Sequence, residues 1–437
     1  MRMDPKRLNP AWISTVLVCV TLTLTTQARA HNDSGYSHDS TISQFRDRWM
    51  NNLSGTARIS ELSLPGTHDT MAFYGGDIAQ TQSLPLLTQL NAGIRVLDIR
   101  ARHINNTFAI HHGIIFQNAY FGDDVMRPII SFLRSHPSET VLIRLSEEYQ
   151  PENTSRSFAD TFLAFMSSYD SSLQTTYGNY VFRPNGATNP ALSQIRGKIV
   201  FMLQPGKFDS PTLSSWGIPY GDGNVMSIQD NYNLGSNWDL HGKWESVRNH
   251  LNAANEGGRG LIYINYLSAS GGSFPYFVAS GHSSPGTGAP RLATGLTTPG
   301  WNSSYPDFPR VDCFIGICTI AFEGTNTLTK DFLQSGRVGF SGIVMADFPG
   351  EGLISAVISR NAFNIITIKS TLNGKCLDMD PADNNIHMWD CHGGTNQQWT
   401  YDKATGAIHS LPSGEIKERA RGSASTWGGA TPRTELA

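Results

Sequence analysis

The chain lacks an excess of charge of either sign. Its 437 residues include 33 Lys and Arg against 36 Asp and Glu, which gives a formal net charge of −3, and only 16% of the residues are charged. Such a chain has no overall basic field that would attract nucleic acid. We therefore expect no nucleic-acid partner, while composition alone names no substrate.

The chain also has little hydrophobic sequence of membrane-spanning length. The apolar stretch at residues 11–24 is shorter than the about 20 residues that cross a bilayer, and no other segment reaches that length. Three basic residues within positions 2–7 precede this stretch, and the small residues of Ala28-Arg29-Ala30 follow it. This layout predicts a secretory signal peptide over residues 1–30 and a secreted protein, with an uncleaved signal anchor as the alternative.

Cysteine is scarce. Of the five cysteines, Cys19 belongs to the predicted signal peptide, which leaves Cys313, Cys318, Cys376 and Cys391. The simplest pairing of this even number is local, Cys313 with Cys318 and Cys376 with Cys391, and a secreted protein permits it. Histidines at zinc-binding spacing do not accompany them, so we expect no metal site. Sequons that suit a glycosylated secreted protein begin at Asn32, Asn52, Asn105, Asn153 and Asn302.

Short apolar runs rich in Ile, Val and Leu recur along the chain and are typical of strands buried on both faces. They cover residues 59–64, 94–99, 108–110, 140–145, 198–203, 260–266 and 342–345. Amphipathic stretches predict helices at residues 82–91, 125–134, 158–166 and 244–254. The alternation predicts an α/β fold with a (β/α) barrel of the TIM type over residues 51–360. We expect an irregular barrel, because the gap between the second and third runs is too short for a helix.

The remaining segments predict less regular structure. Residues 31–50 are polar and predict a loose leader, while residues 207–245 and 268–310 predict long rim loops. Several aromatic residues of these loops are compatible either with contact to a lipid surface or with covering of the barrel. They are Trp216, Trp238, Phe274, Tyr276 and Phe277.

Two histidines stand in short motifs at the ends of apolar runs. Leu-Pro-Gly-Thr-His-Asp at residues 64–69 contains His68, and Ala-Ile-His-His-Gly at residues 109–113 contains His112. Arg100 lies between them, in another such run. A base, an acid and a guanidinium at strand ends are what in-line attack on a phosphodiester requires. Barrel enzymes place such residues at the carboxyl ends of their strands.

These motifs, followed by Pro-Ser-Glu-Thr at residues 137–140, resemble in their order the X domain of phosphatidylinositol-specific phospholipases C in its bacterial, metal-independent form. The resemblance spans residues 50–360 and is strongest in its first third. It implies that His68 is the general base, His112 the general acid and Arg100 the phosphate-binding residue. The nucleophile would be the inositol 2-hydroxyl of the substrate, so the chain needs no serine or cysteine nucleophile.

Three carboxylates complete the set that the resemblance implies. Asp69 would keep the acid histidine protonated, and Asp98 would orient Arg100. Asp347, in Val-Met-Ala-Asp-Phe-Pro at residues 344–349, would hydrogen-bond the base histidine and fix its tautomer. In the calcium-dependent animal enzymes of this superfamily an acidic calcium ligand stands where Arg100 stands here. The resemblance therefore implies no cofactor and no metal.

Only some of the residues with which the family contacts the lipid headgroup have counterparts in this sequence. Asp230 and Tyr232 resemble an aspartate that binds inositol and a tyrosine that stacks on its ring. Where the bacterial enzymes carry a lysine and an arginine, this chain has Ser146 and Gln204, and Gln204 remains a substrate-binding candidate. The nearby cations that would replace the missing ones are Arg144 or Lys207.

The character of the sequence changes near residue 366. Gly-Lys-Cys-Leu-Asp at residues 374–378 and Gln-Gln-Trp at residues 397–399 resemble one repeat of a ricin-type β-trefoil lectin, a family that pairs the two cysteines found here. A trefoil needs three such repeats, and only about 70 residues remain. We expect an incomplete trefoil-like segment at residues 366–414 and an unstructured tail at residues 415–437. By the same resemblance, the sugar-binding residues of the trefoil-like segment would be Asp378, Trp389, Asn396 and Gln397.

The main hypothesis is a secreted, monomeric phosphatidylinositol phosphodiesterase that forms diacylglycerol and inositol 1,2-cyclic phosphate. Glycosylphosphatidylinositol lipids would be further substrates, and glycans would be partners of the lectin-like tail. One alternative keeps the site but changes the lipid headgroup, which Ser146 and Gln204 motivate. Another is a non-catalytic protein that binds glycans or lipid surfaces, against which the retained histidines, Arg100 and Asp347 argue.

Overall fold

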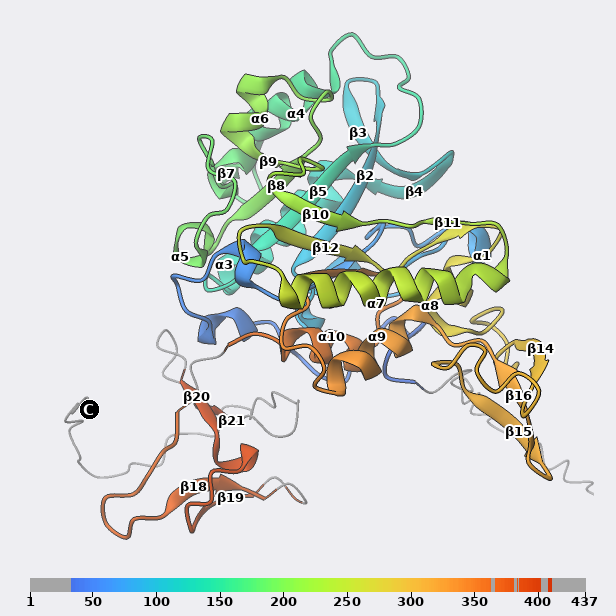
Figure 1. Cartoon of the computed structure of the whole chain (residues 1–437). Coiled ribbons are helices and arrows are strands. Elements are labelled where there is room, and N and C mark those ends of the chain that lie inside the picture. The colour runs from blue at the N-terminus through green and yellow to red at the C-terminus, as the bar shows by residue number, and fades with distance from the viewer. Residues whose placement is uncertain (1–32, 363–365, 381–382, 384, 402–407, 411–437) are drawn as a thin grey trace, which may run out of the picture.

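The structure is a computed structural model that describes residues 33–362, 366–380, 383, 385–401 and 408–410 (Figure 1). A barrel-like body is built on a curled sheet with helices around it, and a smaller segment of short strands follows at the C-terminal end. The predicted signal peptide and the predicted tail lie outside the described residues. In the part that is described, the helices are too short or too polar to cross a bilayer.

The body is formed by parallel strands in the order β10-β12-β17-β1-β2-β5-β8-β9. Its last strand, β17, lies beside its first, β1, as in a (β/α) barrel. β10 and β9 are the two ends of this order, so among the described strands the curled sheet is open between them. The bounds are β1 Leu64–Thr67, β2 Val96–Ile104, β5 Val141–Glu147, β8 Ile199–Leu203, β9 Gly217–Pro219, β10 Met226–Gln229, β12 Ile262–Tyr266 and β17 Ile343–Ala346.

The strands of the body are apolar because both of their faces are covered. Every residue of β8, β12 and β17 is buried, as expected of parallel strands that lie under helices. The predicted strands that correspond to β5, β8, β12 and β17 are confirmed. The run at residues 59–64 differs, since residues 59–61 form a 3-10 turn and the strand begins only at Leu64. The side chain of Glu61 accepts a hydrogen bond from the Arg58 N–H over 2.7 Å, which closes that turn.

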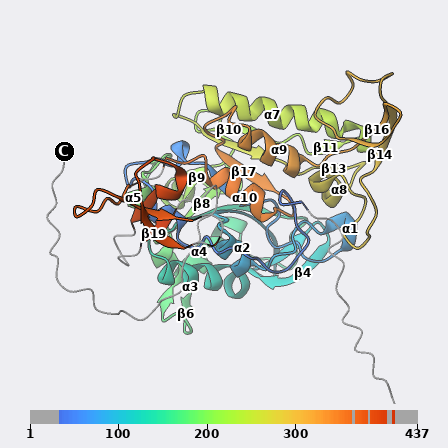
Figure 2. The ribbon, with the colours of Figure 1, turned by 90° about the horizontal axis from the view of Figure 1, so that it is seen from below.

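The helices surround the sheet. Seen from below, α7 and α9 lie along one side of the barrel and α3 along the other (Figure 2). The four predicted helices are confirmed as α2, α3, α4 and α7. The longer helices are α2 Leu86–Ala92, α3 Arg127–Ser135, α4 Phe158–Ser167, α7 Leu240–Glu256, α9 Thr325–Gln334 and α10 Glu351–Ile358. The short ones are η1 Trp49–Asn52, η2 Ile59–Glu61, α1 Gly76–Ala79, η3 Phe121–Met126, η4 Tyr177–Tyr180, α5 Leu192–Ile195, α6 Ser210–Trp216, η5 Asn237–Asp239, α8 Pro275–Ser280 and η6 Thr395–Gln397.

The third predicted run is not a strand of the barrel. It forms β3 Thr107–His112, which turns back antiparallel on β2 and pairs with β4 Ile115–Tyr120. The turn between β2 and β3 contains Asn105 and Asn106, both with positive φ. So short a connection can join only antiparallel strands, because a parallel pair needs a crossover of a dozen or more residues.

The two predicted rim loops contain more regular structure than expected. Residues 207–245 include α6, β9, β10, the short strand β11 Asn233–Leu234 and the start of α7. The second loop includes α8 and leads into a separate antiparallel sheet, whose order is β14-β16-β15. Its strands are β14 Ala293–Thr297, β15 Arg310–Phe314 and β16 Ile317–Ala321. The other short strands of the body are β6 Tyr169–Asp170, β7 Thr175–Thr176 and β13 Ser270–Gly271.

Both predicted disulfides are confirmed, Cys313 with Cys318 and Cys376 with Cys391. The first joins the facing ends of β15 and β16 around a four-residue tip. The second joins the start of β18 Cys376–Met379 to Cys391, just after the end of β19 Ile386–Trp389. Two further strands follow, β20 Trp399–Tyr401 and β21 Ile408–Ser410.

The described part of the predicted leader is packed rather than loose. Tyr36, Trp49 and Met50 are almost completely buried, because these apolar residues find places against the barrel. The indole N–H of Trp49 donates to the Gly93 carbonyl over 3.0 Å. We call residues 33–37 the N-terminal strap, since they run along the loop that follows β17 and hydrogen-bond to its backbone.

Candidate active site

The site begins where β1 and β17 end. Thr67 of β1 pairs with Ala346 of β17, so the next residues in each chain segment, His68 and Asp347, lie side by side. The Nδ1 atom of His68 is 2.8 Å from Oδ1 of Asp347. The Asp347 side chain is 2% exposed, so this carboxylate is held in place by its surroundings and fixes the orientation of the imidazole.

The other ring nitrogen of His68 meets a guanidinium group. Arg100, in β2, donates from Nη2 to Nε2 of His68 over 2.6 Å. Because Nε2 accepts this hydrogen bond, we assign the ring proton to Nδ1, which faces Asp347. The ring also lies edge-on to Tyr266, with centroids 6.0 Å apart. The accepting nitrogen of the histidine therefore stands directly beside a positive charge.

Asp98 of β2 binds two guanidinium groups, one with each carboxylate oxygen. Its Oδ2 is 3.3 Å from Nε of Arg100, and its Oδ1 is 2.6 Å from Nη1 of Arg144. Burial alone would raise the pKa of Asp98, but the charges of Arg144 and Arg100 hold that pKa below its usual value. Burial likewise opposes the charge of Arg100, yet Asp98 and Asp69 raise the pKa of that guanidinium. All three groups of the cluster are therefore ionised at neutral pH.

The hairpin of β3 and β4 brings His112 to the same place. Its Nδ1 is 2.7 Å from the Ala79 carbonyl oxygen and 3.3 Å from Oδ2 of Asp69. Since Nδ1 is engaged by these groups, a ligand would meet Nε2. Asp69 is fully buried, and burial raises its pKa to about 7, although Arg100 and His68 act in the opposite direction. Its Oδ2 is also 3.8 Å from Nε of Arg100, so Asp69 connects the two histidines through the arginine.

The structure thus brings together all six residues that the sequence assigns to catalysis. They are His68, Asp69, Asp98, Arg100, His112 and Asp347. Three of them lie in β2 or β3, and three directly follow β1 or β17. These four strands lie side by side in the sheet or in its hairpin extension. A bound phosphodiester would have a base, an acid and a guanidinium within one polar cluster.

Of the four residues predicted to bind substrate, Arg144 alone joins this cluster. Asp230 follows directly after β10 and is exposed, and the ring of Tyr232 is 62% exposed. Gln204 is also exposed, just past the end of β8. These three residues stand at the rim of the barrel. The other candidate cation, Lys207, is held by Glu147 over 2.7 Å.

One buried amide that sequence reasoning missed holds the backbone at His68 in place. Gln82 Nε2 donates to the carbonyl oxygens of His68 and Ala346, at 2.8 and 3.0 Å. It ties the end of β1 to the end of β17 and so holds His68 beside Asp347. The sequence offers no local signal for this role, because it depends on where the loop after β1 folds back.

A buried lysine near the site was also missed. Lys243 of α7 is fully buried, and its Nζ donates to Oε1 of Gln229 over 3.3 Å. Burial lowers its pKa to about 8, while Asp230 and Asp347 raise it. A signal exists here, because Lys243 occupies a position on the apolar face of α7 between the buried Leu240 and Val247.

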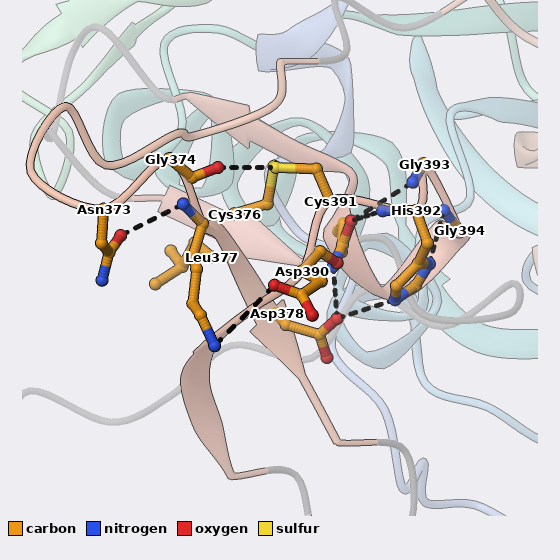
Figure 3. The surroundings of a disulfide bond; sticks show 12 residues. Asn373, Gly374, Cys376, Leu377, Asp378, Asp390, Cys391, His392, Gly393 and Gly394 are labelled. Atoms are coloured by element: carbon orange, nitrogen blue, oxygen red, sulfur yellow. Dashed lines mark hydrogen bonds and ion pairs between the residues drawn. A yellow bond between two sulfur atoms is a disulfide. The ribbon is translucent and has the colours of Figure 1, made fainter.

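The C-terminal segment is organised around Asp378. This carboxylate is 3% exposed and accepts hydrogen bonds from Nδ2 of Asn396 and Nε2 of Gln397, at 2.9 and 2.7 Å. His392 Nε2 lies 3.1 Å away, beside the second disulfide (Figure 3). Gln397 is fully buried and its amide also bonds backbone groups, so it holds the repeat together instead of facing a sugar. Trp389, in contrast, is 54% exposed.

Comparison with known protein families agrees with both predicted resemblances. The family described as phosphatidylinositol-specific phospholipase C, X domain, matches residues 67–204. This range contains five of the six residues predicted to be catalytic and ends at residue 204, just past β8. The family described as ricin-type beta-trefoil lectin domain matches residues 364–425.

A curated relative decides the family. The 1-phosphatidylinositol phosphodiesterase of Listeria monocytogenes is 34% identical over 240 residues, which are 52% of this chain and 69% of that protein. This chain belongs to the phosphatidylinositol-specific phospholipase C family. The 1-phosphatidylinositol phosphodiesterase of Staphylococcus aureus is 28% identical over 298 residues, which are 61% of this chain and 90% of that protein.

Solved structures of this phospholipase C family share the fold. The Listeria monocytogenes enzyme superposes with a TM-score of 0.50 at 26% identity and covers 73% of this chain and 100% of its own. A Staphylococcus aureus phospholipase C gives 0.52 at 20% identity over 73% of this chain and 98% of its own, a likeness of fold alone. The phospholipase C described here is therefore a TIM-type barrel of that family, followed by a ricin-type trefoil segment.

Proposed function

We propose that this protein is a phosphatidylinositol phosphodiesterase that cleaves the bond between glycerol and phosphate by histidine acid–base catalysis. The observation that carries the proposal is the position of His68, whose two ring nitrogens meet Asp347 at 2.8 Å and Arg100 at 2.6 Å. A neutral imidazole that is oriented by a carboxylate and lies beside a phosphate-binding cation is equipped to deprotonate a hydroxyl next to a phosphodiester.

The reaction is an intramolecular displacement at phosphorus. His68 Nε2 takes the proton of the inositol 2-hydroxyl as its oxygen forms a bond to phosphorus. The bond from phosphorus to the glycerol oxygen breaks, and His112 gives its proton to that oxygen. The products are diacylglycerol and inositol 1,2-cyclic phosphate, and the two histidines together have exchanged one proton with the substrate.

Arg100 has two roles in this proposal, one in the free site and one when substrate is bound. In the free site its Nη2 donates to the same nitrogen of His68 that must accept the substrate proton. An anionic phosphate is a stronger acceptor for a guanidinium than a neutral imidazole is. On binding, we propose that Nη2 turns from His68 to a phosphate oxygen, which frees the base and stabilises the charge that develops on the phosphoryl group.

Phosphorus NMR of the products of the purified protein tests the proposed reaction. Release of a strained five-membered cyclic phosphate from phosphatidylinositol supports it. Failure to turn over any inositol lipid would favour a non-catalytic surface-binding protein, and faster cleavage of other phospholipids would favour a different headgroup. A glycosylphosphatidylinositol substrate belongs in the same comparison, because it contains the same linkage.

Substitution of the histidines tests the assigned roles. We expect His68→Ala and His112→Ala each to lower turnover by at least ~100-fold, the scale of general acid–base catalysis. His387→Ala, in the C-terminal segment, is the control and should leave turnover of a short-chain soluble substrate unchanged. Near-normal activity of either active-site variant removes that histidine from the mechanism.

We also propose that the protein is secreted. The N-terminal pattern at residues 1–30, the two disulfides and the exposed sequon residues Asn105, Asn153 and Asn302 support this. Asn52, in contrast, is 6% exposed and unsuited to a glycan. Mass spectrometry of protein collected from the medium should find an N-terminus after Ala30, and an intact N-terminus on cell-bound protein would contradict it.

A further inference from the structure

The pairing of β2 with β5 places an arginine next to the central carboxylate of the site. Asp98 of β2 is in register with Arg144 of β5, and Arg100 is in register with Ser146. Residues in register on neighbouring strands project from the same face of a sheet. Arg144 is therefore the neighbour of Asp98 on the adjacent strand. The neighbour of the phosphate-binding Arg100 is Ser146, which has a small side chain.

Two contacts hold the side chain of Arg144 in this position. Its Nη1 donates to Oδ1 of Asp98 over 2.6 Å, and its guanidinium carbon lies 4.8 Å from the ring centroid of Tyr220. The Tyr220 hydroxyl is 2.9 Å from that of Tyr266, the residue that packs edge-on against His68. The Arg144 side chain is 21% exposed, so its charge is largely withdrawn from solvent.

The charges of this cluster do not cancel. Arg100 and Arg144 are both positive, and both contact Asp98. Asp69 also lies 3.8 Å from Nε of Arg100, but burial raises its pKa to about 7, so it is only partly ionised at neutral pH. The two phenols beside Arg144 remain neutral, because burial raises the pKa of Tyr220 and of Tyr266. If Arg144 were absent, Asp98 would offset the charge of Arg100, the cation that must attract the phosphate.

We propose that Arg144 is a positioning residue that supplies the counter-charge to Asp98 and so leaves the charge of Arg100 available to the anionic substrate. The inference rests on the proposed function, because it assigns Arg100 to the phosphate. It also changes the role expected for Arg144, which acts through Asp98 instead of contacting the headgroup. Asp98 can then hold Arg100 in place through Oδ2 without neutralising it.

Equilibrium binding of two probes of different charge tests this inference. The affinity for inorganic phosphate depends on the charge at Arg100. The affinity for neutral myo-inositol depends on the predicted headgroup residues at the rim of the barrel, such as Asp230 and Tyr232. We expect Arg144→Gln to weaken phosphate binding by about tenfold or more, because one nearby charge is lost from a partly buried cluster. Binding of myo-inositol should change by less than about twofold, since a neutral ligand does not sense that charge.

Two further variants separate a counter-charge from a direct contact. Arg144→Lys keeps the charge and should stay within about threefold of the wild-type phosphate affinity. In the double variant Arg144→Gln/Asp98→Asn the carboxylate charge is removed as well, so phosphate affinity should recover toward the wild-type value. If the double variant binds phosphate as weakly as Arg144→Gln, Arg144 contacts the phosphate itself and the inference is wrong.

Other outcomes are equally decisive. Unchanged phosphate affinity in Arg144→Gln overturns the inference, and so does an equal loss of both probes, which would indicate a structural role. Should Arg144→Gln not fold, a loss of phosphate affinity in folded Arg144→Lys overturns it, and retained affinity supports it. Turnover of phosphatidylinositol by the wild-type protein is measured separately, so failure of the proposed function is distinguished from failure of this inference.

Discussion

At the scale of single residues, the protonation state of Asp69 affects both His112 and Arg100. It is fully buried, 3.3 Å from Nδ1 of His112 and 3.8 Å from Nε of Arg100. Burial raises its pKa to about 7. Below this pKa the carboxyl group is neutral and gives His112 no anionic partner, whereas above it the carboxylate stabilises the imidazolium that serves as the acid in the proposed mechanism.

The raised pKa of Asp69 predicts a pH-dependent contribution to stability. The folded carboxyl group binds its proton more tightly than the unfolded one, whose pKa is 3.8, so its contribution is fully present below that value. It is lost as the pH rises through about 7. We expect the difference in free energy of unfolding between the wild type and Asp69→Asn to fall over this range. Chemical denaturation at a series of pH values measures it, and a constant difference would mean that Asp69 is ionised throughout.

A second prediction at this scale concerns metal ions. Asp98, the carboxylate at the centre of the cluster, uses one oxygen for each of two guanidinium groups. A divalent cation would have to displace both positive charges to reach it. We therefore expect a calcium chelator to leave the turnover rate unchanged, with the free-calcium concentration checked by a dye. A large loss of rate that added calcium restores would contradict the role given to Arg100.

At the scale of elements, the sequence predicted those strands whose own residues carry the signal. β8, β12 and β17 are continuous apolar runs, and burial of both faces requires such runs. β9 and β10 contain Gly, Pro, Ser and Gln, and they become strands only because β8 and β12 offer them edges. No local pattern encodes that pairing, so these strands were mistaken for a loop.

The same distinction explains which site residues could be predicted. His68, His112 and Arg100 stand in motifs that are recognisable within a few residues. The contacts of Arg144 with Asp98 depend on the register between β5 and β2, and those of Gln82 on the course of a loop. Such contacts join residues that are far apart in the sequence, so a single chain read locally does not reveal them.

The sheet of β14, β15 and β16 ends in an exposed apolar tip. At its tip, Phe314, Ile315 and Ile317 are 74%, 83% and 53% exposed to solvent. The disulfide between Cys313 and Cys318 links the two strands directly behind these residues. It projects at the end of the barrel where α1 and β11 lie, the end that carries the candidate site (Figures 1 and 2). Of the aromatic residues considered for lipid contact, Tyr276 and Phe277 are buried and cover the barrel.

This tip predicts how the enzyme reaches a lipid substrate. We expect Phe314→Ser/Ile315→Ser to weaken binding to phosphatidylinositol vesicles by at least tenfold, because each apolar side chain that enters the bilayer contributes about 1.5–3 kcal/mol. Turnover of a short-chain soluble substrate should not change. Leu372→Ser, at an apolar residue that is 94% exposed in the C-terminal segment, is the matched control. Vesicle binding as tight as that of the control would rule out the tip as the contact.

At the scale of the whole molecule, the N-terminal strap connects the first described residues to the end of the last barrel strand. The Ser37 N–H donates to the Phe348 carbonyl and the Gly350 N–H to the Gly35 carbonyl, both over 2.9 Å. Asp33, at the start of the strap, pairs with Lys330 of α9 at 2.9 Å. Phe348 itself has a φ of 45°, an unfavourable conformation that needs support from its surroundings.

The strap therefore supports the loop that places Asp347 beside His68. A single added methyl group in this loop should weaken the contact between the loop and the strap. A Cβ at Gly350 would collide with the Ser34 carbonyl and lie 2.6 Å from the Tyr36 nitrogen, so Gly350→Ala must push the strap away. Because a misplacement of about 1 Å can cost up to 100-fold in rate, we expect kcat to fall by about tenfold or more. Binding of myo-inositol, predicted to involve Asp230 and Tyr232 after β10, should persist.

Gly339→Ala is the matched control, since its added Cβ meets only the Asn255 side chain, at 3.8 Å. Overpacking of this kind also costs about 1–3 kcal/mol, so Gly350→Ala should unfold at a lower temperature than the control. If it instead melts lower with an unchanged kcat, the strap stabilises the fold without positioning Asp347. A fall in kcat that accompanies the shift would show that the N-terminal strap positions Asp347, which follows the last barrel strand, and through it the proposed base His68.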